Sequence, residues 1–198
     1  VILDKIETFF LDKNITNHTN MDKITTRLII SQGLLMPKST RRQAHYHQDA
    51  LFRYARILGF GEIHFKMDAQ TGLESIIAIH STTCGPAIGG CRFYPYRSSG
   101  QALKDALRLS YMMTLKAAVS NLPHGGAKSV IMMPPVIKNR KKLFGAFGRF
   151  VNEMDGRYIT AMDVGTSTED MDAIAEFTPH VIGAASVDHQ QEDPSPYT

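Results

Sequence analysis

The chain has 198 residues, of which 43% are hydrophobic, and this is enough for one packed core with an appendage. Its 22 lysines and arginines exceed its 19 aspartates and glutamates by only three charges, too few to indicate a nucleic-acid-binding protein. No apolar run approaches the roughly 20 residues that a membrane helix needs, and the acidic start does not resemble a signal peptide. Two cysteines cannot form a disulfide framework. We therefore expect a soluble, cytoplasmic protein that binds neither nucleic acid nor membranes.

The first part of the chain differs in composition from the rest. Residues 1–45 are polar and rich in Thr, Asn and Lys, which predicts an appendage that is partly disordered or helical. In residues 46–198, segments typical of strands alternate with segments typical of helices. This alternation predicts one α/β domain with a mixed sheet flanked by helices.

The strands of this domain are predicted first from alternation. Residues 62–67 alternate as a half-buried strand does, 68–72 are typical of a hairpin turn, and 73–80 form the returning strand. The third strand, 87–94, contains Gly89 and Gly90. Glycines inside a strand often mark a close approach of another backbone or of a ligand.

The rest of the domain continues the alternation of helix and strand. The predicted elements are a helix from Ser98 or Ser99 to about 119, a strand over 128–133, a helix over 138–154, a strand over 158–161, and a helix from Ser167 or Thr168 to 176. Within the long helix, Met112 and Met113 are expected to fill the core rather than to face a ligand.

Three charged residues are the candidates for chemistry. Lys128 follows two glycines and precedes an apolar strand, where burial would lower its pKa into a useful range. Lys116 lies twelve residues earlier, near the end of the long helix. Asp163 lies in an apolar stretch, where it either caps a helix or takes part in a reaction. Together they suit a small anionic substrate: one lysine holds a carboxylate, the other polarises a carbonyl or activates water, and the aspartate moves a proton at nitrogen.

The sequence argues against two other kinds of site. A phosphate-binding loop needs a glycine directly before its Lys-Ser pair, but Ala127 stands there, so this interpretation fails. His80, Cys84 and Cys91 lie near one another in sequence, but they lack the paired spacing of a zinc site. No metal is predicted.

Several motifs, taken together, are highly specific. These motifs lie at residues 85–92, 105–109, 113–116, 125–128 and 156–166. They resemble the Glu/Leu/Phe/Val amino-acid dehydrogenases, and most closely the leucine and phenylalanine enzymes, over about residues 50–198. The resemblance implies oxidative deamination of an amino acid to its 2-oxo acid, with NAD as the hydride acceptor.

The resemblance also implies roles for the charged residues. Lys128 would be the catalytic lysine that activates water and stabilises charge on the carbinolamine oxygen. Asp163 would exchange a proton with the amino group. Lys116 would bind the substrate carboxylate with help from the backbone of Gly89 and Gly90.

The remaining implied contacts concern specificity and the cofactor. Glutamate-specific members have a lysine where this chain has Ile88, so an apolar substrate such as leucine or valine is expected. Met113 and Ala161 would contact the same substrate. Arg92 would face the cleft near substrate or cofactor, and Thr198 would be a further cofactor contact.

Family members continue into a second, nucleotide-binding domain with a glycine-rich fingerprint. No Gly-x-Gly-x-x-Gly occurs in the 198 residues. We therefore expect the substrate-binding and oligomerisation domain of an NAD-dependent dehydrogenase, truncated before its cofactor domain, homo-oligomeric, and inactive alone. The alternatives are a non-catalytic oligomerisation module or an amino-acid-binding relic of the family.

Overall fold

The computed structural model describes residues 56–186. The predicted appendage 1–45 and the cofactor contact Thr198 lie outside the described residues. The chain divides into two compact units, 1–57 and 58–198. Residues 58–186 are the described part of the second unit.

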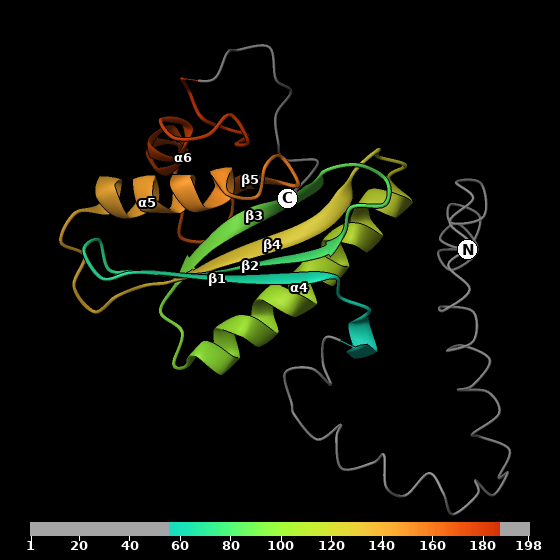
Figure 1. Ribbon diagram of the computed structural model, residues 1–198, viewed down its shortest axis with the longest axis horizontal. Coiled ribbons are helices and arrows are strands. Elements are labelled where there is room, and N and C mark those ends of the chain that lie inside the picture. The colour runs from blue at the N-terminus through green and yellow to red at the C-terminus, as the bar shows by residue number, and fades with distance from the viewer. Residues whose placement is uncertain (1–55, 187–198) are drawn as a thin grey trace, which may run out of the picture. The chain divides into compact units, whose positions relative to one another are not determined.

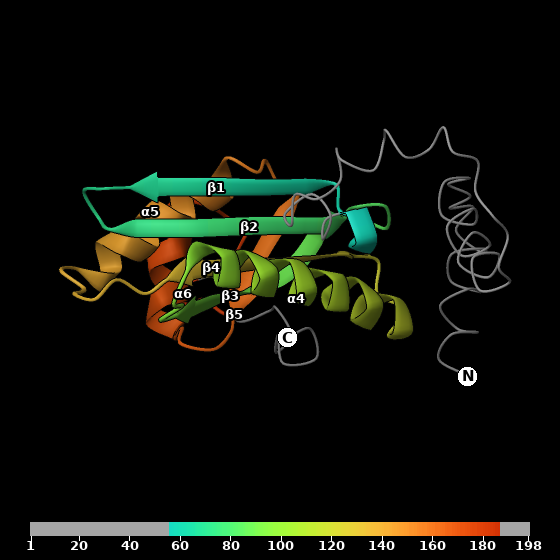
Figure 2. The ribbon, with the colours of Figure 1, turned by 90° about the horizontal axis from the view of Figure 1, so that it is seen from below.

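This unit is built on a mixed five-stranded sheet. Its strands are β1 (Glu62–Asp68), β2 (Leu73–Ser81), β3 (Ala87–Tyr94), β4 (Gly125–Met132) and β5 (Tyr158–Met162). Their order in the sheet is β1-β2-β4-β3-β5, so that β4 is central (Figure 2). β2 pairs antiparallel with both β1 and β4, whereas β3 pairs parallel with both β4 and β5. The predicted α/β fold with a mixed sheet is confirmed.

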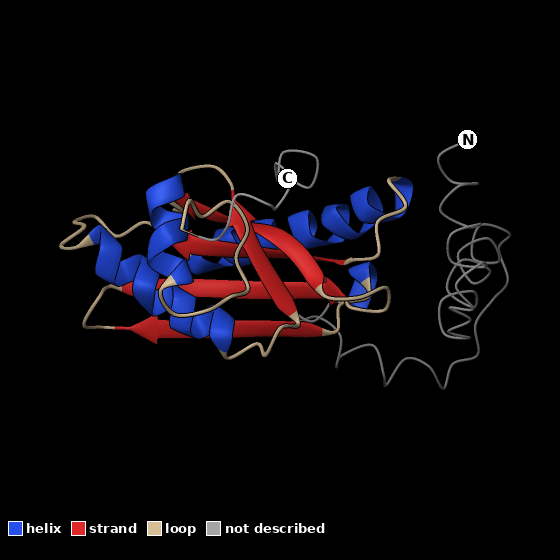
Figure 3. Cartoon of the chain, turned by 90° about the horizontal axis from the view of Figure 1, so that it is seen from above, coloured by secondary structure: helices blue, strands red, loops and turns tan. Residues whose placement is uncertain are grey.

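Helices cover both faces of the sheet. They are α4 (Ser99–Val119), α5 (Arg140–Asn152) and α6 (Thr168–Ala175). Helix α4 packs on β2 and β4 from one side, and α5 and α6 lie together on the other side (Figures 1 and 3). The cap of α4 is Ser98, whose side chain accepts a hydrogen bond from the backbone N–H of Gln101.

The strand and helix predictions are confirmed to within a few residues, but the start of β4 was predicted too late. The strand begins at Gly125, so Gly125 and Gly126 extend it instead of forming a turn before it. The physical reason is crowding. A Cβ on Gly125 would collide with the carbonyl oxygen of Ser81, and one on Gly126 would collide with the backbone and hydroxyl of Thr114 on α4. Only glycine lets β4 approach both neighbours so closely.

The prediction for the two methionines was wrong for Met112. This side chain is 52% exposed on α4, because it points away from the sheet. Met113 is half-buried and lines a small cavity. A helix turns by about 100° per residue, so neighbours cannot both face the core.

The two faces of the sheet have different contents, because successive residues of a strand point to opposite sides. On the face of α5 and α6, the core contains Ala87, Cys91, Phe93, Ala127, Ile131 and Tyr158. The alternate positions on the face of α4 are Ile88, Gly90, Arg92, Gly126, Lys128, Ala161 and Asp163. Every described residue for which a role was predicted from β3, β4 or β5, apart from Gly89, therefore belongs to one face.

Candidate active site

Lys128 lies near the middle of the central strand and is only 4% exposed. Its Nζ is 3.0 Å from Oδ1 of Asp163. Burial lowers the pKa of Lys128, and the attraction of the Asp163 carboxylate offsets part of that effect. The side chain is thus a paired, desolvated amine, not a surface charge.

Asp163 directly follows β5 and caps no helix. The cap of α6 is Ser167, whose backbone N–H donates to Asp170 Oδ2 at 2.9 Å. The second carboxylate oxygen of Asp163 accepts from Nε of Arg92 at 2.8 Å. Burial alone would raise the pKa of Asp163, but the charges and hydrogen bonds of Lys128 and Arg92 outweigh it and hold that pKa below its ordinary value. The carboxylate is therefore an anion held between two cations.

Gly90 makes room for this pair. A Cβ on Gly90 would lie 2.8 Å from Cβ of Asp163, 2.9 Å from the carbonyl oxygen of Met162 and 3.1 Å from Nζ of Lys128. Its partner across the β3–β5 ladder is Ala161, which is fully buried. The absence of a side chain at Gly90 thus leaves the lysine and the aspartate in contact.

Gly89 serves the opposite side of the strand. A Cβ there would collide with the carbonyl group of Ala127 on β4. Its own carbonyl oxygen accepts a hydrogen bond from the hydroxyl of Tyr158 at 2.8 Å. Gly89 is thus required for the packing of β3 against β4, in addition to the substrate role predicted for its backbone.

Arg92 connects the pair to a further carboxylate that the sequence reasoning missed. Its NH1 donates to Oδ2 of Asp105 on α4 at 2.9 Å. The hydroxyl of Tyr96 donates to the same oxygen at 2.8 Å. Asp105 lies in one of the sequence motifs of the resemblance, but nothing in the sequence indicates which strand residue its side chain reaches.

An open groove of about 660 Å³ lies beside this network. Its lining residues are Arg92, Tyr94, Tyr96, Gln101, Lys104, Asp105, Arg108 and Val164. Three of the eight are cationic and one is anionic. The groove therefore has a positive balance, which favours an anionic ligand over a cationic one.

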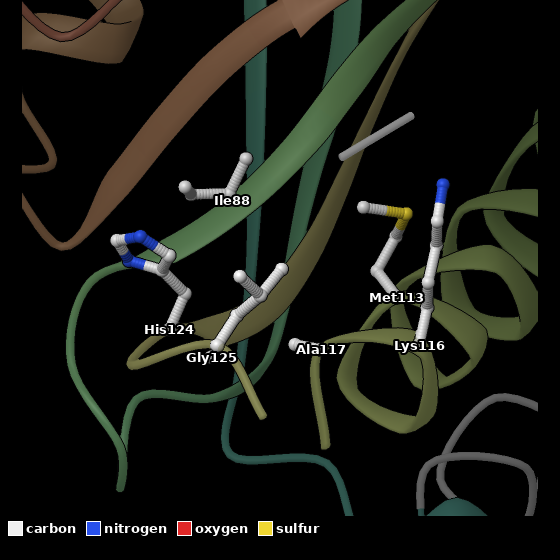
Figure 4. Close-up of a pocket in the computed structure, with 7 residues that line it drawn as sticks. Ile88, Met113, Lys116, Ala117, His124 and Gly125 are labelled. Carbon is white, nitrogen blue, oxygen red and sulfur yellow. The ribbon is translucent and has the colours of Figure 1, made fainter. Parts of the chain in front are cut away.

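A second cluster lies at the other end of β3. Ile88 on β3 faces Met113 and Lys116, which lie side by side on α4, around a cavity of about 10 Å³ (Figure 4). The other lining residues are Ala117, Leu122, His124 and Gly125. The cavity has room for about one water molecule. Three residues predicted to bind substrate, namely Ile88, Met113 and Lys116, are thus brought together, whereas Leu122 and His124 were not predicted.

The two clusters follow one another along a single strand. Ile88, Gly90 and Arg92 occupy alternate positions of β3 on the face of α4, so the strand passes from an apolar end to a charged end. The apolar end also holds Lys116, so one cluster offers both a cation and apolar side chains, which suits a small molecule with a carboxylate, a reactive carbon and an apolar tail. A lysine of lowered pKa beside a carboxylate can move protons at its reactive carbon.

Two further findings limit other kinds of site. Among residues 56–186, no group of three or more His, Cys, Asp or Glu side chains could hold a metal ion. The ring of His80 instead makes hydrogen bonds of 2.8 Å with the hydroxyl of Thr114 and the carbonyl oxygen of Leu58. No helix within the described part of the chain is long and apolar enough to cross a membrane.

The chain is similar in sequence to known amino-acid dehydrogenases. The family model that matches residues 60–180 is the dimerisation domain of the Glu/Leu/Phe/Val dehydrogenases. The chain is 45% identical over 148 residues to the leucine dehydrogenase of Bacillus subtilis (strain 168), covering 75% of this chain and 41% of that protein. It is 47% identical over 117 residues to the valine dehydrogenase of Streptomyces coelicolor (strain ATCC BAA-471 / A3(2) / M145), covering 59% of this chain and 32% of that protein.

Solved structures agree with this result. The crystal structure of L-tryptophan dehydrogenase from Nostoc punctiforme matches with a TM-score of 0.64 and 44% identity, over 66% of this chain and 39% of the other. Hetero-hexameric glutamate dehydrogenase from Thermus thermophilus shares the fold, with a TM-score of 0.51, 22% identity, and coverage of 78% of this chain and 44% of that one. The chain thus spans about two fifths of the length of the leucine dehydrogenase that it matches. Because the family model covers more than half of its residues, this chain belongs to the Glu/Leu/Phe/Val dehydrogenase family, and the part that matches is the family's dimerisation domain.

Proposed function

We propose that this chain is the substrate-binding domain of an NAD-dependent dehydrogenase that deaminates apolar L-amino acids to 2-oxo acids. The observation that carries the proposal is the buried Lys128–Asp163 pair, whose charged atoms are 3.0 Å apart beneath the bare backbone of Gly90. Surface lysines do not need such an arrangement, whereas an acid–base pair does.

The proposed mechanism assigns one task to each charged residue. Lys116 and the backbone of Gly89 and Gly90 hold the substrate carboxylate. When the amino acid has become an imino acid, water attacks its carbon and the amine of Lys128 removes a proton from that water, which gives a neutral carbinolamine. Asp163 receives that proton from the Lys128 cation across their 3.0 Å contact and passes it to the amino nitrogen. The C–N bond then breaks: ammonia leaves, the hydroxyl proton returns to Lys128, and the 2-oxo acid is formed. The lowered pKa of Lys128 increases the fraction of neutral amine available for the first step.

NAD would supply the hydride acceptor for the first oxidation. The described residues do not form a dinucleotide site: the sequence has no glycine fingerprint, and Nε and NH1 of Arg92 already donate to Asp163 and Asp105. The predicted cofactor role of Arg92 therefore remains a proposal.

Leucine or valine is the proposed substrate, with the side chain placed near Ile88, Met113 and Ala161. Ile88 is 5% exposed and offers no charge, and the neighbouring Lys116 is assigned to the main-chain carboxylate. The side-chain carboxylate of glutamate would therefore be buried there without a partner of its own. Leucine, valine and tryptophan dehydrogenases are all among the similar proteins, and their substrates have apolar side chains.

The decisive experiment uses the protein at its natural length. NADH formation is followed with leucine, valine and glutamate, and kcat and KM are compared for wild type and Lys128→Met. Removal of a general acid–base group is expected to lower kcat by about 10²–10⁴-fold. The matched control is Lys142→Met, on the exposed side of α5.

Three outcomes separate the candidate functions. Turnover of leucine or valine that disappears in Lys128→Met supports the enzyme. Binding of leucine without turnover, measured by calorimetry, favours the amino-acid-binding relic. Turnover that survives in Lys128→Met contradicts the role assigned to that lysine.

We further propose that the domain forms a homo-oligomer through its sheet edge. Strand β1 is an edge strand with Phe65 58% exposed and Met67 76% exposed, and such an edge is a template for pairing with a second copy. The variant Phe65→Asp is expected to lower the sedimentation coefficient. Met112→Lys, at a side chain that is 52% exposed on α4, should leave the sedimentation coefficient unchanged. Identical sedimentation of Phe65→Asp and wild type would contradict this interface.

A further inference from the structure

Asp105 is a carboxylate with a complete set of donors. Both Arg92 NH1 and the hydroxyl of Tyr96 donate to its Oδ2, at 2.9 and 2.8 Å, and Arg108 NH2 donates to Oδ1 at 3.2 Å. Its side chain is mostly buried, whereas that of Arg108 is largely exposed. Arg92 and Tyr96 are therefore the partners that fix the position of Asp105, since exposed ion pairs contribute little to stability.

Arg92 is held at two edges of its planar guanidinium group. Nε contacts Asp163 on one edge, and NH1 contacts Asp105 on another. A free arginine side chain has many rotamers, and ordering one of them lowers the conformational entropy of the folded chain. Two carboxylates at fixed angles select one rotamer, and that rotamer is the one that reaches Asp163.

Charges alternate along the whole network. The cations Lys128 and Arg92 flank Asp163, and the cations Arg92 and Arg108 flank Asp105. Burial and the Asp105 carboxylate raise the pKa of Tyr96, so its hydroxyl keeps the proton that it donates. No two like charges are in direct contact along this path.

We propose that Asp105, steadied by Tyr96, is a positioning residue: it holds the Arg92 guanidinium against Asp163 and so keeps the Asp163 carboxylate aligned with Lys128. Asp105 lies on α4 and Asp163 follows β5, and Arg92 on β3 connects them. The effect of this positioning on catalysis rests on the proposed function, in which Asp163 exchanges a proton. The positioning itself does not.

The first test needs no enzymatic activity. The side-chain carboxyl of Asp163 is titrated by ¹³C NMR in the full chain, in wild type and in Asp105→Ala. Loss of the anchor releases Arg92 from Asp163, so the titration midpoint of Asp163 should move to higher pH. Asp105→Asn, which keeps an oxygen acceptor for Arg92, should show a smaller shift in the same direction.

A double-mutant cycle identifies the route of the effect. Arg92→Met alone should also raise the midpoint of Asp163, and adding Asp105→Ala to it should change nothing further, because both act through one contact. Additive shifts, or an Asp105→Ala midpoint equal to that of wild type, would overturn the proposal. Glu74→Ala, at an exposed position of β2, is the control for a distant carboxylate.

The second test measures turnover in the protein at its natural length. Asp105→Ala is expected to lower kcat on the order of 10-fold to 100-fold and to move the acidic limb of the rate profile to higher pH, since misplacement of a catalytic group has effects of this size. Asp105→Asn should recover part of the rate. A loss of melting temperature with an unchanged pH profile would mean a purely structural role. If wild type shows no turnover, the proposed function fails, and the titration still decides the positioning role.

Discussion

The two faces of the sheet bury polar groups of different kinds, neutral hydroxyls on one face and an ion pair on the other. On the face of α5 and α6, the hydroxyl of Tyr158 is 2.8 Å from that of Ser129 and donates to the carbonyl oxygen of Gly89, so a neutral network is closed within the core. On the face of α4, Lys128 and Asp163 form an ion pair. A neutral, fully satisfied network stiffens a core, whereas a charged pair beside a groove can exchange protons with a ligand. Lys128 and Ser129 are adjacent on β4 and point to opposite faces, so the first belongs to the charged site and the second to the neutral core network.

The largest expected effect comes from breaking the charged pair. Asp163→Asn leaves the Lys128 cation buried without its counter-ion, so the free energy of unfolding should fall by about 3 kcal/mol near pH 7. Because the pKa of Asp163 is lower in the folded chain than its ordinary value of 3.8, its stabilisation is present above that pH and is lost as the pH falls through the folded value. Urea unfolding of wild type and variant should therefore converge in acid. Curves that stay parallel down to pH 2 would contradict this coupling.

The next largest effect comes from filling the space between the two charges. Gly90→Ala places a methyl group 3.1 Å from Nζ of Lys128 and 2.8 Å from Cβ of Asp163, so the pair must separate. Overpacking of this kind lowers the free energy of unfolding by about 1–3 kcal/mol. The control is Gly100→Ala, in the first turn of α4, where the nearest atom is the hydroxyl oxygen of Ser98 at 4.0 Å. That change should be neutral or slightly stabilising by thermal denaturation, because alanine favours the helix.

The smallest expected effect lies on the neutral face. Ser129→Ala removes one hydroxyl beside Tyr158, whose hydroxyl keeps its partners at Gly89 and Thr160. The free energy of unfolding should fall by about 1 kcal/mol. The titration of Asp163, followed by NMR, should not change. A shifted Asp163 titration midpoint in this variant would show that the two faces are coupled, and it would contradict the independence of the two networks.

Much of this arrangement can be predicted from sequence, and the failures have physical causes. Alternation and turn residues place the β1–β2 hairpin, and the caps place α4 and α6, because these signals are local. Lys128 and Asp163 stand out through motifs. The contact between Asp105 and Arg92 has no local signal, since it depends on how α4 crosses β3.

The start of β4 shows a different cause of failure. Gly125 and Gly126 look like a turn, because glycine is the commonest turn residue, but here they relieve contacts with Ser81 and Thr114 that exist only in the folded sheet. The pairing register of β4, and with it the face that Lys128 occupies, is likewise set by two neighbouring strands distant in sequence.

The central position of β4 has a consequence for the order in which the chain folds. Strands β2 and β3 are separated by a connection of only a few residues, but they are not neighbours in the sheet, because β4 lies between them. A direct β2–β3 hairpin would be the fastest pairing to form and would exclude β4. In the folded sheet that place is taken by β4, which follows α4 in the chain. The contact between Lys128 on β4 and Asp163 after β5 therefore depends on the pairings of β3 with β4 and β5, and not on the two strands that are nearest in sequence.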